Sequence, residues 1–332
     1  MLTRRQMLIA AGTVLLSASG CSKLKLPVTP AEVPAAEQGP RPYRVALLSD
    51  PHTEAKTSLT FGATGGKLSQ AVADLNPLII DQWLCCGDVA NHGLPEEWEA
   101  YKSVLAKVSK PDQWLVTTGN HEFYNEASDQ EVLQGFRKAF SLQRPYSNKV
   151  AGGVHFVMLA DEQYKTAPGA REWAWVTPEQ LRWFEQVLQE HRDKFTVVCL
   201  HQPLQETVLW SHGGNDFAGC GQVKQLRAIL QKNPQVRLWL SGHTHLALQW
   251  EGQVVRQGGV TFACLGSTYY QFVASDAPED QGGWPAAGGY KKDLSASQSR
   301  VMEVWPDRVV VRARDHVKQV WLDKLQFEIA RG

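Results

Sequence analysis

Five short polar segments of the sequence combine side chains that bind metal ions or transfer protons. The segments are Asp50-Pro51-His52, Gly87-Asp88, Gly119-Asn120-His121-Glu122, His201 and Gly242-His243-Thr244-His245. They hold half of the 10 histidines of this 332-residue chain. Imidazole nitrogens and carboxylate oxygens form a ligand set that suits transition metals. One such histidine is most often a capping or surface residue, but five in this arrangement predict a metal site.

Each polar segment follows a run of residues with the composition of a buried strand. Strands are predicted at residues 44–49, 78–86, 113–118, 154–160, 195–200, 236–241 and 259–265. Because the carboxyl ends of parallel strands meet at one edge of a sheet, the segments are expected to converge there. The spacing of Asp50 and His52 lets both side chains project to one side of an extended chain. Gly87, Gly119 and Gly242 precede predicted ligands, where the backbone must turn sharply and allow close approach.

Helical patterns lie between the predicted strands, at residues 65–75, 95–108, 177–192 and 222–232. In the clearest, 177–192, Thr177 is expected to cap the first turn and Gln180 to complete a capping box. Leu181, Phe184 and Leu188 fall on one face of this helix. The alternation of strands and helices predicts an α/β fold with helices covering the sheet faces.

The remaining stretches have weaker patterns. Residues 202–221 and 275–299 are long and irregular, as expected of loops at the rim of a site or of surface insertions. After residue 300 the chain is expected to form a hairpin that turns at Pro306-Asp307.

In this order, the five polar segments resemble the calcineurin-like metallophosphoesterase family, over residues 50–245. The resemblance implies a four-layer α/β/β/α sandwich of two mixed sheets. It also implies two divalent or trivalent transition-metal ions, of iron, manganese, zinc or cobalt. One metal would be held by Asp50, His52, Asp88 and His245, and the second by Asp88, Asn120, His201 and His243, so that Asp88 bridges them.

The resemblance further implies a reaction, the hydrolysis of a phosphoester by a hydroxide that bridges the two metals. His121 would then be the general acid that protonates the leaving group. His92 and Asn120 would contact the substrate, while Asn91 and Glu122 would support the site. In the related phosphoprotein phosphatases, aspartate and arginine stand at the positions of Asn91 and His92. This departure argues against a protein substrate, and the Asn91 side chain is expected to accept a hydrogen bond from His121.

The function predicted from these residues is hydrolysis of a small phosphodiester or phosphomonoester. One alternative is a phosphomonoesterase of the nucleotidase or acid phosphatase type. Its substrate could stack on aromatic side chains at a rim, for which the candidates are Trp210, His212 and Tyr269-Tyr270. Another alternative is an envelope protein that binds metal without catalysis. Binding of nucleic acid is not expected, because 34 basic residues balance 34 acidic ones.

The N-terminus has the features of an export signal. Residues 1–21 pair Arg4-Arg5 with a short apolar run, which resembles a twin-arginine signal peptide. Cys21 ends a lipobox-like sequence and is predicted to carry a lipid, although an ordinary signal peptide or an uncleaved anchor remain alternatives. A Pro/Ala-rich tether over 22–42 and a single metallophosphoesterase domain over 43–332 would follow. The predicted location is the bacterial envelope, at the outer side of the cytoplasmic membrane or in the periplasm.

The other cysteines are not expected to form a disulfide framework. Five remain after Cys21, an odd number without paired spacing: Cys85, Cys86, Cys199, Cys220 and Cys264. Most lie in or beside apolar strand-like runs, so they are predicted to be free and buried.

Overall fold

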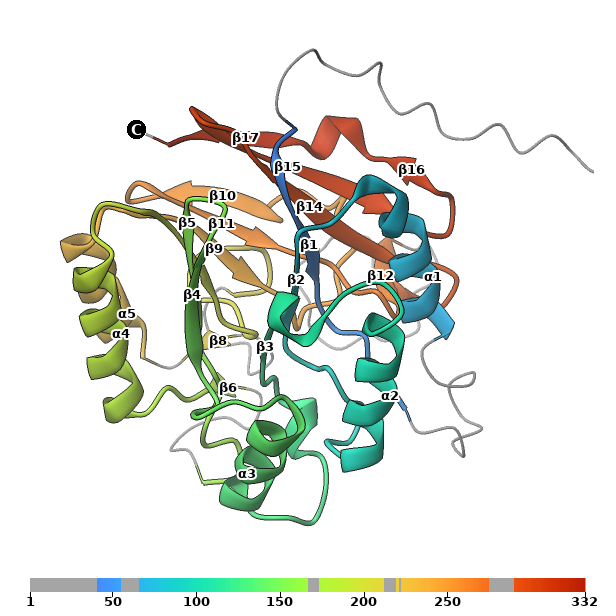
Figure 1. The fold of residues 1–332 in the computed structure, drawn as a ribbon, viewed down its shortest axis with the longest axis horizontal. Helices are drawn as coiled ribbons and strands as arrows, with labels where there is room; N and C mark the ends of the chain where they lie inside the picture. The colour runs from blue at the N-terminus through green and yellow to red at the C-terminus, as the bar shows by residue number, and fades with distance from the viewer. Residues whose placement is uncertain are drawn as a thin grey trace, which may run out of the picture. The chain divides into compact units, whose positions relative to one another are not determined.

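Two mixed sheets form the centre of the protein in the computed structural model (Figure 1). The structure describes residues 41–54, 66–166, 173–211, 219–220, 222–274 and 290–331. The first sheet has the order β16-β15-β14-β1-β2-β3, with β17 beside β15, and the second has the order β10-β11-β9-β7-β5-β4. The strands of the first sheet are β1 (Tyr43–Leu48), β2 (Gln82–Cys86), β3 (Trp114–Thr117), β14 (Gln298–Val304), β15 (Arg308–Asp315), β16 (Val320–Trp321) and β17 (Phe327–Ala330). Those of the second are β4 (Ser147–Ala151), β5 (Val154–Met158), β7 (Phe195–Cys199), β9 (Val236–Ser241), β10 (Val254–Gln257) and β11 (Val260–Cys264).

Parallel strands occupy the part of each sheet from which the polar segments emerge. In the first sheet β1, β2 and β3 are parallel neighbours, whereas β14 pairs with β1 in the antiparallel sense. In the second sheet β5, β7, β9 and β11 are parallel, and β4 and β10 are antiparallel edge strands. Two short pairs, β6 (Trp173–Ala174) with β8 (Gly219–Cys220) and β12 (Gln271–Ala274) with β13 (Tyr290–Asp293), lie outside these sheets.

Alternating side chains of the strands build three apolar layers. Val45 and Leu47 of β1 join a core that also contains Phe156 and Met158 of β5, so this core lies between the sheets. Ala46 and Leu48 instead join a cluster with the helices α1 (Gly66–Leu75), α2 (Pro95–Leu105) and α3 (Asp129–Ala139). The helices α4 (Pro178–Glu190) and α5 (Val223–Lys232) cover the outer face of the second sheet. The result is the predicted four-layer α/β/β/α sandwich.

Most predicted elements are confirmed, with ends shifted by one or a few residues. The strand predicted at 78–86 begins too early, because Asn76–Leu78 forms a 3₁₀ turn and β2 starts at Gln82. Ile79 has a left-handed φ of 57°, which ends the turn. The predicted irregular stretch 275–299 contains β13 and the start of β14. The hairpin after residue 300 is confirmed as β14 and β15.

At the start of α4 the predicted cap is confirmed, but the predicted capping box is not. Thr177 caps the helix, and its hydroxyl accepts the N–H of Gln180 at 3.2 Å. The capping box is wrong, because the Gln180 side chain is fully buried and bonds the N–H and C=O of Ala160 at 2.8 and 3.0 Å. Glu162 takes the expected place of Gln180 by accepting the N–H of Thr177 at 3.2 Å. Gln180 therefore joins α4 to the end of β5.

Several predictions fall on residues outside those that the structure describes. They are the signal peptide, Cys21, most of the tether and His212. The part from Pro42 to Gly332 forms one compact unit. Within the described part, no helix is long and apolar enough to cross a membrane. Four of the predicted free cysteines, Cys85, Cys86, Cys199 and Cys264, are free and buried.

A buried ion pair joins α1 to β15 and gives stability a dependence on pH. Asp74 accepts two hydrogen bonds from Arg314 (2.8 and 2.6 Å) and one from His316 (2.9 Å), and its side chain is 4% exposed. Burial by itself raises the pKa of Asp74, but the hydrogen bonds from Arg314 and His316 outweigh burial and lower it. The pair therefore contributes stability above the unfolded pKa of about 3.9, and this contribution is lost as the pH falls through the lower folded pKa.

Replacement of Asp74 by asparagine should lower the free energy of unfolding by about 3 kcal/mol at pH 7, because Arg314 is left without its buried partner. Urea denaturation at several pH values measures this loss, which should shrink below about pH 4 as the wild-type carboxylate takes up its proton. Asp307→Asn is the control, since Asp307 pairs with Arg308 at the surface. A loss that stays constant down to acid pH would contradict the ion-pair explanation.

Candidate metal centre

The polar segments meet where the carboxyl ends of parallel strands from both sheets come together. The residues that follow β1, β2, β3, β7 and β9 are, in that order, Asp50 with His52, Asp88, Asn120, His201, and His243 with His245. The two sheets are joined at this edge, because the backbone N–H of His243 donates to Asp50 Oδ1 at 3.0 Å. The structure thus brings together all seven residues that the family resemblance assigns to metals.

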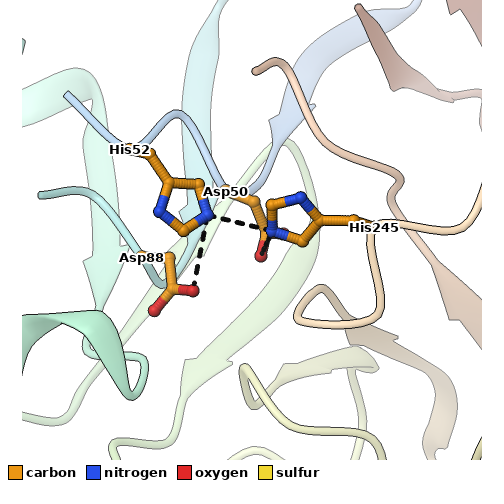
Figure 2. Close-up of side chains that lie close together, drawn as sticks. All are labelled: Asp50, His52, Asp88 and His245. Atoms are coloured by element: carbon orange, nitrogen blue, oxygen red, sulfur yellow. Dashed lines mark hydrogen bonds and ion pairs between the residues drawn. The ribbon is translucent and has the colours of Figure 1, made fainter. Parts of the chain in front are cut away.

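The first group of ligand atoms comes from four buried residues, which Figure 2 shows pointing toward one another. They are Asp50, His52, Asp88 and His245, and one ligand atom of each lies within 4.8 Å of the others. His245 Nε2 is 3.0 Å from Asp50 Oδ1 and 2.9 Å from His52 Nε2. His52 Nε2 is 3.6 Å from Asp88 Oδ2. This is the ligand set expected for the first metal.

The second group contains Asp88 again, with His201 and His243. His201 Nε2 lies 3.1 Å from Asp88 Oδ2. Asn120 Oδ1 lies 2.9 Å from His243 Nδ1, and its Nδ2 donates to the hydroxyl of Tyr124 at 2.9 Å. The tyrosine thereby turns the amide oxygen of Asn120 toward the group. Asp88 is shared by both groups, as a bridging ligand must be.

The hydrogen bonds of His201 show that this donor set fits a cation. His201 Nδ1 lies 2.6 Å from the Cys86 carbonyl, which can only accept, so Nδ1 carries hydrogen and Nε2 of the neutral ring has a lone pair. That lone pair faces the Asp88 carboxylate, and the two repel each other unless a proton or a metal ion lies between them. Burial lowers the pKa of His201, but Asp88 and Asp50 outweigh it and hold this pKa well above its usual range. A transition-metal ion supplies the same positive charge.

The backbone at the ligands is strained. Five non-glycine residues of the two groups have left-handed φ angles, namely Asp50 (50°), His52 (41°), Asp88 (48°), His243 (67°) and His245 (51°). Such conformations cost of order 1–3 kcal/mol each and tend to cluster at functional sites. Aspartate and histidine tolerate this region better than branched residues do. Asp50 and His52 therefore reach the same group through left-handed turns and not through the extended chain that was expected. His243 and His245, also two residues apart, reach different groups.

Glycines allow the loops to approach one another, as predicted. A Cβ on Gly119 would lie 2.3 Å from Asp88 Oδ1, and one on Gly242 would lie 1.9 Å from Ser49 Oγ. A Cβ on Gly87 would meet the ring of His201 at 2.6 Å. Of these three glycines only Gly87 has a positive φ (81°), so the sharp turn is confirmed at one position and the close approach at all three.

Glu122 connects the loops after β2 and β3 from a fully buried position. Its Oε2 accepts the N–H groups of Asp88 (3.1 Å) and Gly119 (2.7 Å), and its Oε1 accepts that of Ala90 (2.9 Å). Burial, and then the charge of Asp88, raise the pKa of Glu122 to about 8. The carboxyl group thus holds the backbone on which the shared ligand sits.

Glu122→Gln should lower the free energy of unfolding by about 1–3 kcal/mol, because its –NH₂ group must face a backbone N–H whichever way the amide turns. Activity should fall about tenfold or more, since Asp88 loses its support. Urea denaturation and steady-state kinetics measure the two effects. Glu179→Gln, at an exposed position of α4, is the control. Equal stability of Glu122→Gln and wild type would show that one acceptor oxygen is sufficient.

His121 lies beside the ligand groups. Its backbone N–H donates to Asp88 Oδ1 at 2.9 Å, and its ring contacts the rings of His52 and Tyr124, with 4.3 and 4.1 Å between centroids. Nδ1 lies 2.9 Å from the backbone carbonyl of Asn91. The expected hydrogen bond to the Asn91 side chain is therefore wrong, since that side chain donates to Glu54 Oε1 at 2.7 Å instead. Burial, opposed by Asp88, lowers the pKa of His121.

The other predicted contacts with substrate are those of His92 and of the aromatic rim. The His92 ring lies 3.2 Å from Glu97 Oε1 and its side chain is 49% exposed, so its contact with substrate stays a prediction. At the aromatic rim, the ring centroids of Tyr270 and His245 are 4.1 Å apart, and those of Tyr269 and His52 are 5.8 Å apart. Trp210 is buried against Phe272 and Tyr290 instead of lining a rim.

Sequence reasoning gave no role to two residues that contact the site. Tyr124 orients Asn120 and packs on His121, and its signal in the sequence is an aromatic residue two positions after the third polar segment. Glu54 accepts a hydrogen bond from Asn91, and its signal is a second acidic residue two positions after His52. Both act through hydrogen bonds that a pattern of residue types does not reveal.

Comparison with known proteins agrees with this geometry. The family model described as calcineurin-like phosphoesterase matches residues 43–247. The probable cyclic nucleotide phosphodiesterase syc0937_d of Synechococcus sp. is 27% identical over 241 residues, which cover 72% of this chain and 82% of the relative. The glycerophosphodiester phosphodiesterase GpdQ of Enterobacter lignolyticus is 24% identical over 212 residues, covering 60% and 70% of the two chains.

Two solved structures share the fold. A dimetal phosphatase from Danio rerio superposes with a TM-score of 0.57 and 12% identity, covering 88% of this chain and all of the other. The purple acid phosphatase PPD1 of yellow lupin superposes with a TM-score of 0.56 and 14% identity, covering 87% of this chain and 53% of the other. At these identities the likeness concerns the fold alone.

Proposed function

We propose that this chain, which belongs to the calcineurin-like phosphoesterase family and is a metal-dependent phosphoester hydrolase, acts on phosphodiesters. The observation that carries the proposal is the pair of ligand groups that share Asp88, with His121 beside them. When bound, two cations supply positive charge that activates water and neutralises the phosphoester oxygens.

The residues of the chain position the ligand groups and the proton that the leaving group needs. Asp88 joins the two ligand groups, and Tyr124 turns the Asn120 oxygen toward the second. The Asn91 carbonyl holds the Nδ1 hydrogen of His121, so Nε2 is the nitrogen that gives a proton to the leaving oxygen. Burial of His121 lowers its pKa, which makes the protonated ring a stronger acid.

Two observations favour a diester over a monoester. The relatives named above, and a 3′,5′-cyclic-nucleotide phosphodiesterase of Nostoc sp. that is 25% identical, all carry names of phosphodiesterases. A monoester dianion also has one more negative charge to neutralise than a diester. Where phosphoprotein phosphatases have an arginine for this purpose, the chain has His92, whose ring pairs with Glu97.

Turnover of two chromogenic esters tests the proposal. The purified protein, loaded in turn with manganese, iron, zinc or cobalt, should hydrolyse bis-p-nitrophenyl phosphate with a higher kcat/KM than p-nitrophenyl phosphate. The opposite order would favour a phosphomonoesterase of the nucleotidase or acid phosphatase type. Metal analysis of protein from its native source identifies the ions that the cell inserts.

The proposed location is the cell envelope, with a lipid on Cys21. The support is the twin-arginine-like pair Arg4-Arg5, the short apolar run and the lipobox-like end of residues 1–21. Cys21→Ser should move the protein from the membrane fraction to the soluble fraction. An unchanged membrane fraction would argue for an uncleaved anchor instead.

A further inference from the structure

We propose that Glu54 is a positioning residue for His121, and that it acts through Asn91. The inference deepens the proposed function, because it rests on His121 as the acid that protonates the leaving group. Glu54 does not touch the ligand groups in this proposal. It sets the direction of the His121 ring, and so the transfer of its proton.

The first link is the hydrogen bond between His121 Nδ1 and the Asn91 carbonyl, at 2.9 Å. A carbonyl can only accept, so it fixes both the hydrogen on Nδ1 and the direction in which the ring points. The ring also contacts His52, nearly perpendicular to it with 4.3 Å between ring centroids, and Tyr124, tilted by 35° with 4.1 Å between ring centroids. The position of one carbonyl oxygen therefore decides where Nε2 lies.

The second link holds that carbonyl in place. The backbone N–H of Asn91 donates to the Thr53 carbonyl at 3.1 Å, and its side-chain Nδ2 donates to Glu54 Oε1 at 2.7 Å. Asn91 is 8% exposed and Glu54 is 4% exposed. Thr53 and Glu54, the two residues that follow the first polar segment, thus hold Asn91 by its main chain and by its side chain.

Stability alone does not account for a carboxylate at this position. Burying a carboxyl group costs free energy that an apolar side chain would not cost. The benefit of Glu54 must then lie in where it holds Asn91. Glu54 lies two residues after His52, so the loop that carries Asp50 and His52 also carries the side chain that holds Asn91.

Esters that differ only in the leaving group separate this role from a structural one. Methyl p-nitrophenyl phosphate releases a stable anion and needs little protonation, whereas methyl phenyl phosphate releases a poorer leaving group and depends on the acid. The ratio of their kcat values should rise about a hundredfold in His121→Ala. In Glu54→Met, which has similar length but only a weakly accepting sulfur, it should rise about tenfold. Glu54→Gln keeps an acceptor oxygen and should restore the wild-type ratio.

Control variants keep every outcome informative. Asn91→Ala retains the carbonyl but cuts the link to Glu54, so it should match Glu54→Met, and the double variant should show no further rise. Glu96→Met, an exposed position of α2, should leave the ratio unchanged. Equal losses on both esters in Glu54→Met would overturn the proposal and assign Glu54 a structural role. A ratio that does not move even in His121→Ala would refute the acid role of His121 itself. If the monoesters are preferred, p-nitrophenyl and phenyl phosphate provide the same comparison.

Discussion

Asp88→Asn should reduce kcat/KM about 10³-fold, a loss of about 4 kcal/mol of transition-state stabilisation. Asp88 Oδ2 faces His201 Nε2 at 3.1 Å and His52 Nε2 at 3.6 Å, so one carboxylate oxygen serves both ligand groups. Its Oδ1 accepts the backbone N–H of His121. An asparagine can keep that hydrogen bond with its oxygen, but it then turns an –NH₂ group, which cannot bind a metal, toward the histidines.

Metal analysis of the purified variant should show fewer bound ions than the wild type. Asp74→Asn is the matched control, since it changes another buried aspartate that lies on α1 and bonds Arg314. It should lose stability while its folded fraction keeps its kcat/KM. Retention of two metals and most of the activity by Asp88→Asn would show that Asp88 does not bridge them.

Removal of the metals by a chelator should abolish turnover and lower the melting temperature by several degrees. Each bound ion adds about 2.7 kcal/mol of stability when its concentration is a hundred times its Kd. Without the ions, the buried carboxylates of Asp50 and Asp88 lie close to the lone pairs of the imidazoles. Differential scanning calorimetry and activity assays, before and after each of manganese, iron, zinc and cobalt is restored, measure the effect.

The same treatment of Asp88→Asn should shift the melting temperature less, because that variant holds fewer ions. A chelated wild-type protein, shown by elemental analysis to be free of metal, should not cleave esters. Full activity in such a sample would exclude a metal-dependent reaction. An unchanged melting temperature with lost activity would mean that the ions are needed for catalysis, and that the two ligand groups are already stable without them.

The sequence indicated which polar residues would lie together, because each candidate ligand follows a strand. The order of the strands in the sheets decides which of these residues converge. β1, β2, β7 and β9 are buried and rich in apolar residues, so their patterns are strong. The edge strand β4 (Ser147–Ala151) has only half-buried or exposed residues and gave no such pattern. Helix α3 was also missed, since only Val132 and Phe136 are its buried apolar residues.

The hydrogen bonds that support the site could not be predicted from residue types. Asn91 was expected to meet His121 with its side chain, but its carbonyl does so because of how the loop after β2 is folded. Gln180 fits the capping-box pattern, yet the end of β5 offers it two backbone partners in a buried place. In both cases tertiary contacts decided between donors and acceptors that the local sequence left equivalent.

The left-handed turns at the ligands limit how this centre can change during evolution. Valine, isoleucine and threonine are very unfavourable at such φ angles, so single substitutions from Asp50, His52, Asp88, His243 or His245 to these residues carry a backbone penalty as well as the loss of a ligand. Glycine has no such penalty and would relax the loop. A descendant that abandons catalysis and metal binding can therefore remove this backbone strain with glycine, and glycine at these positions would be the expected trace of that history.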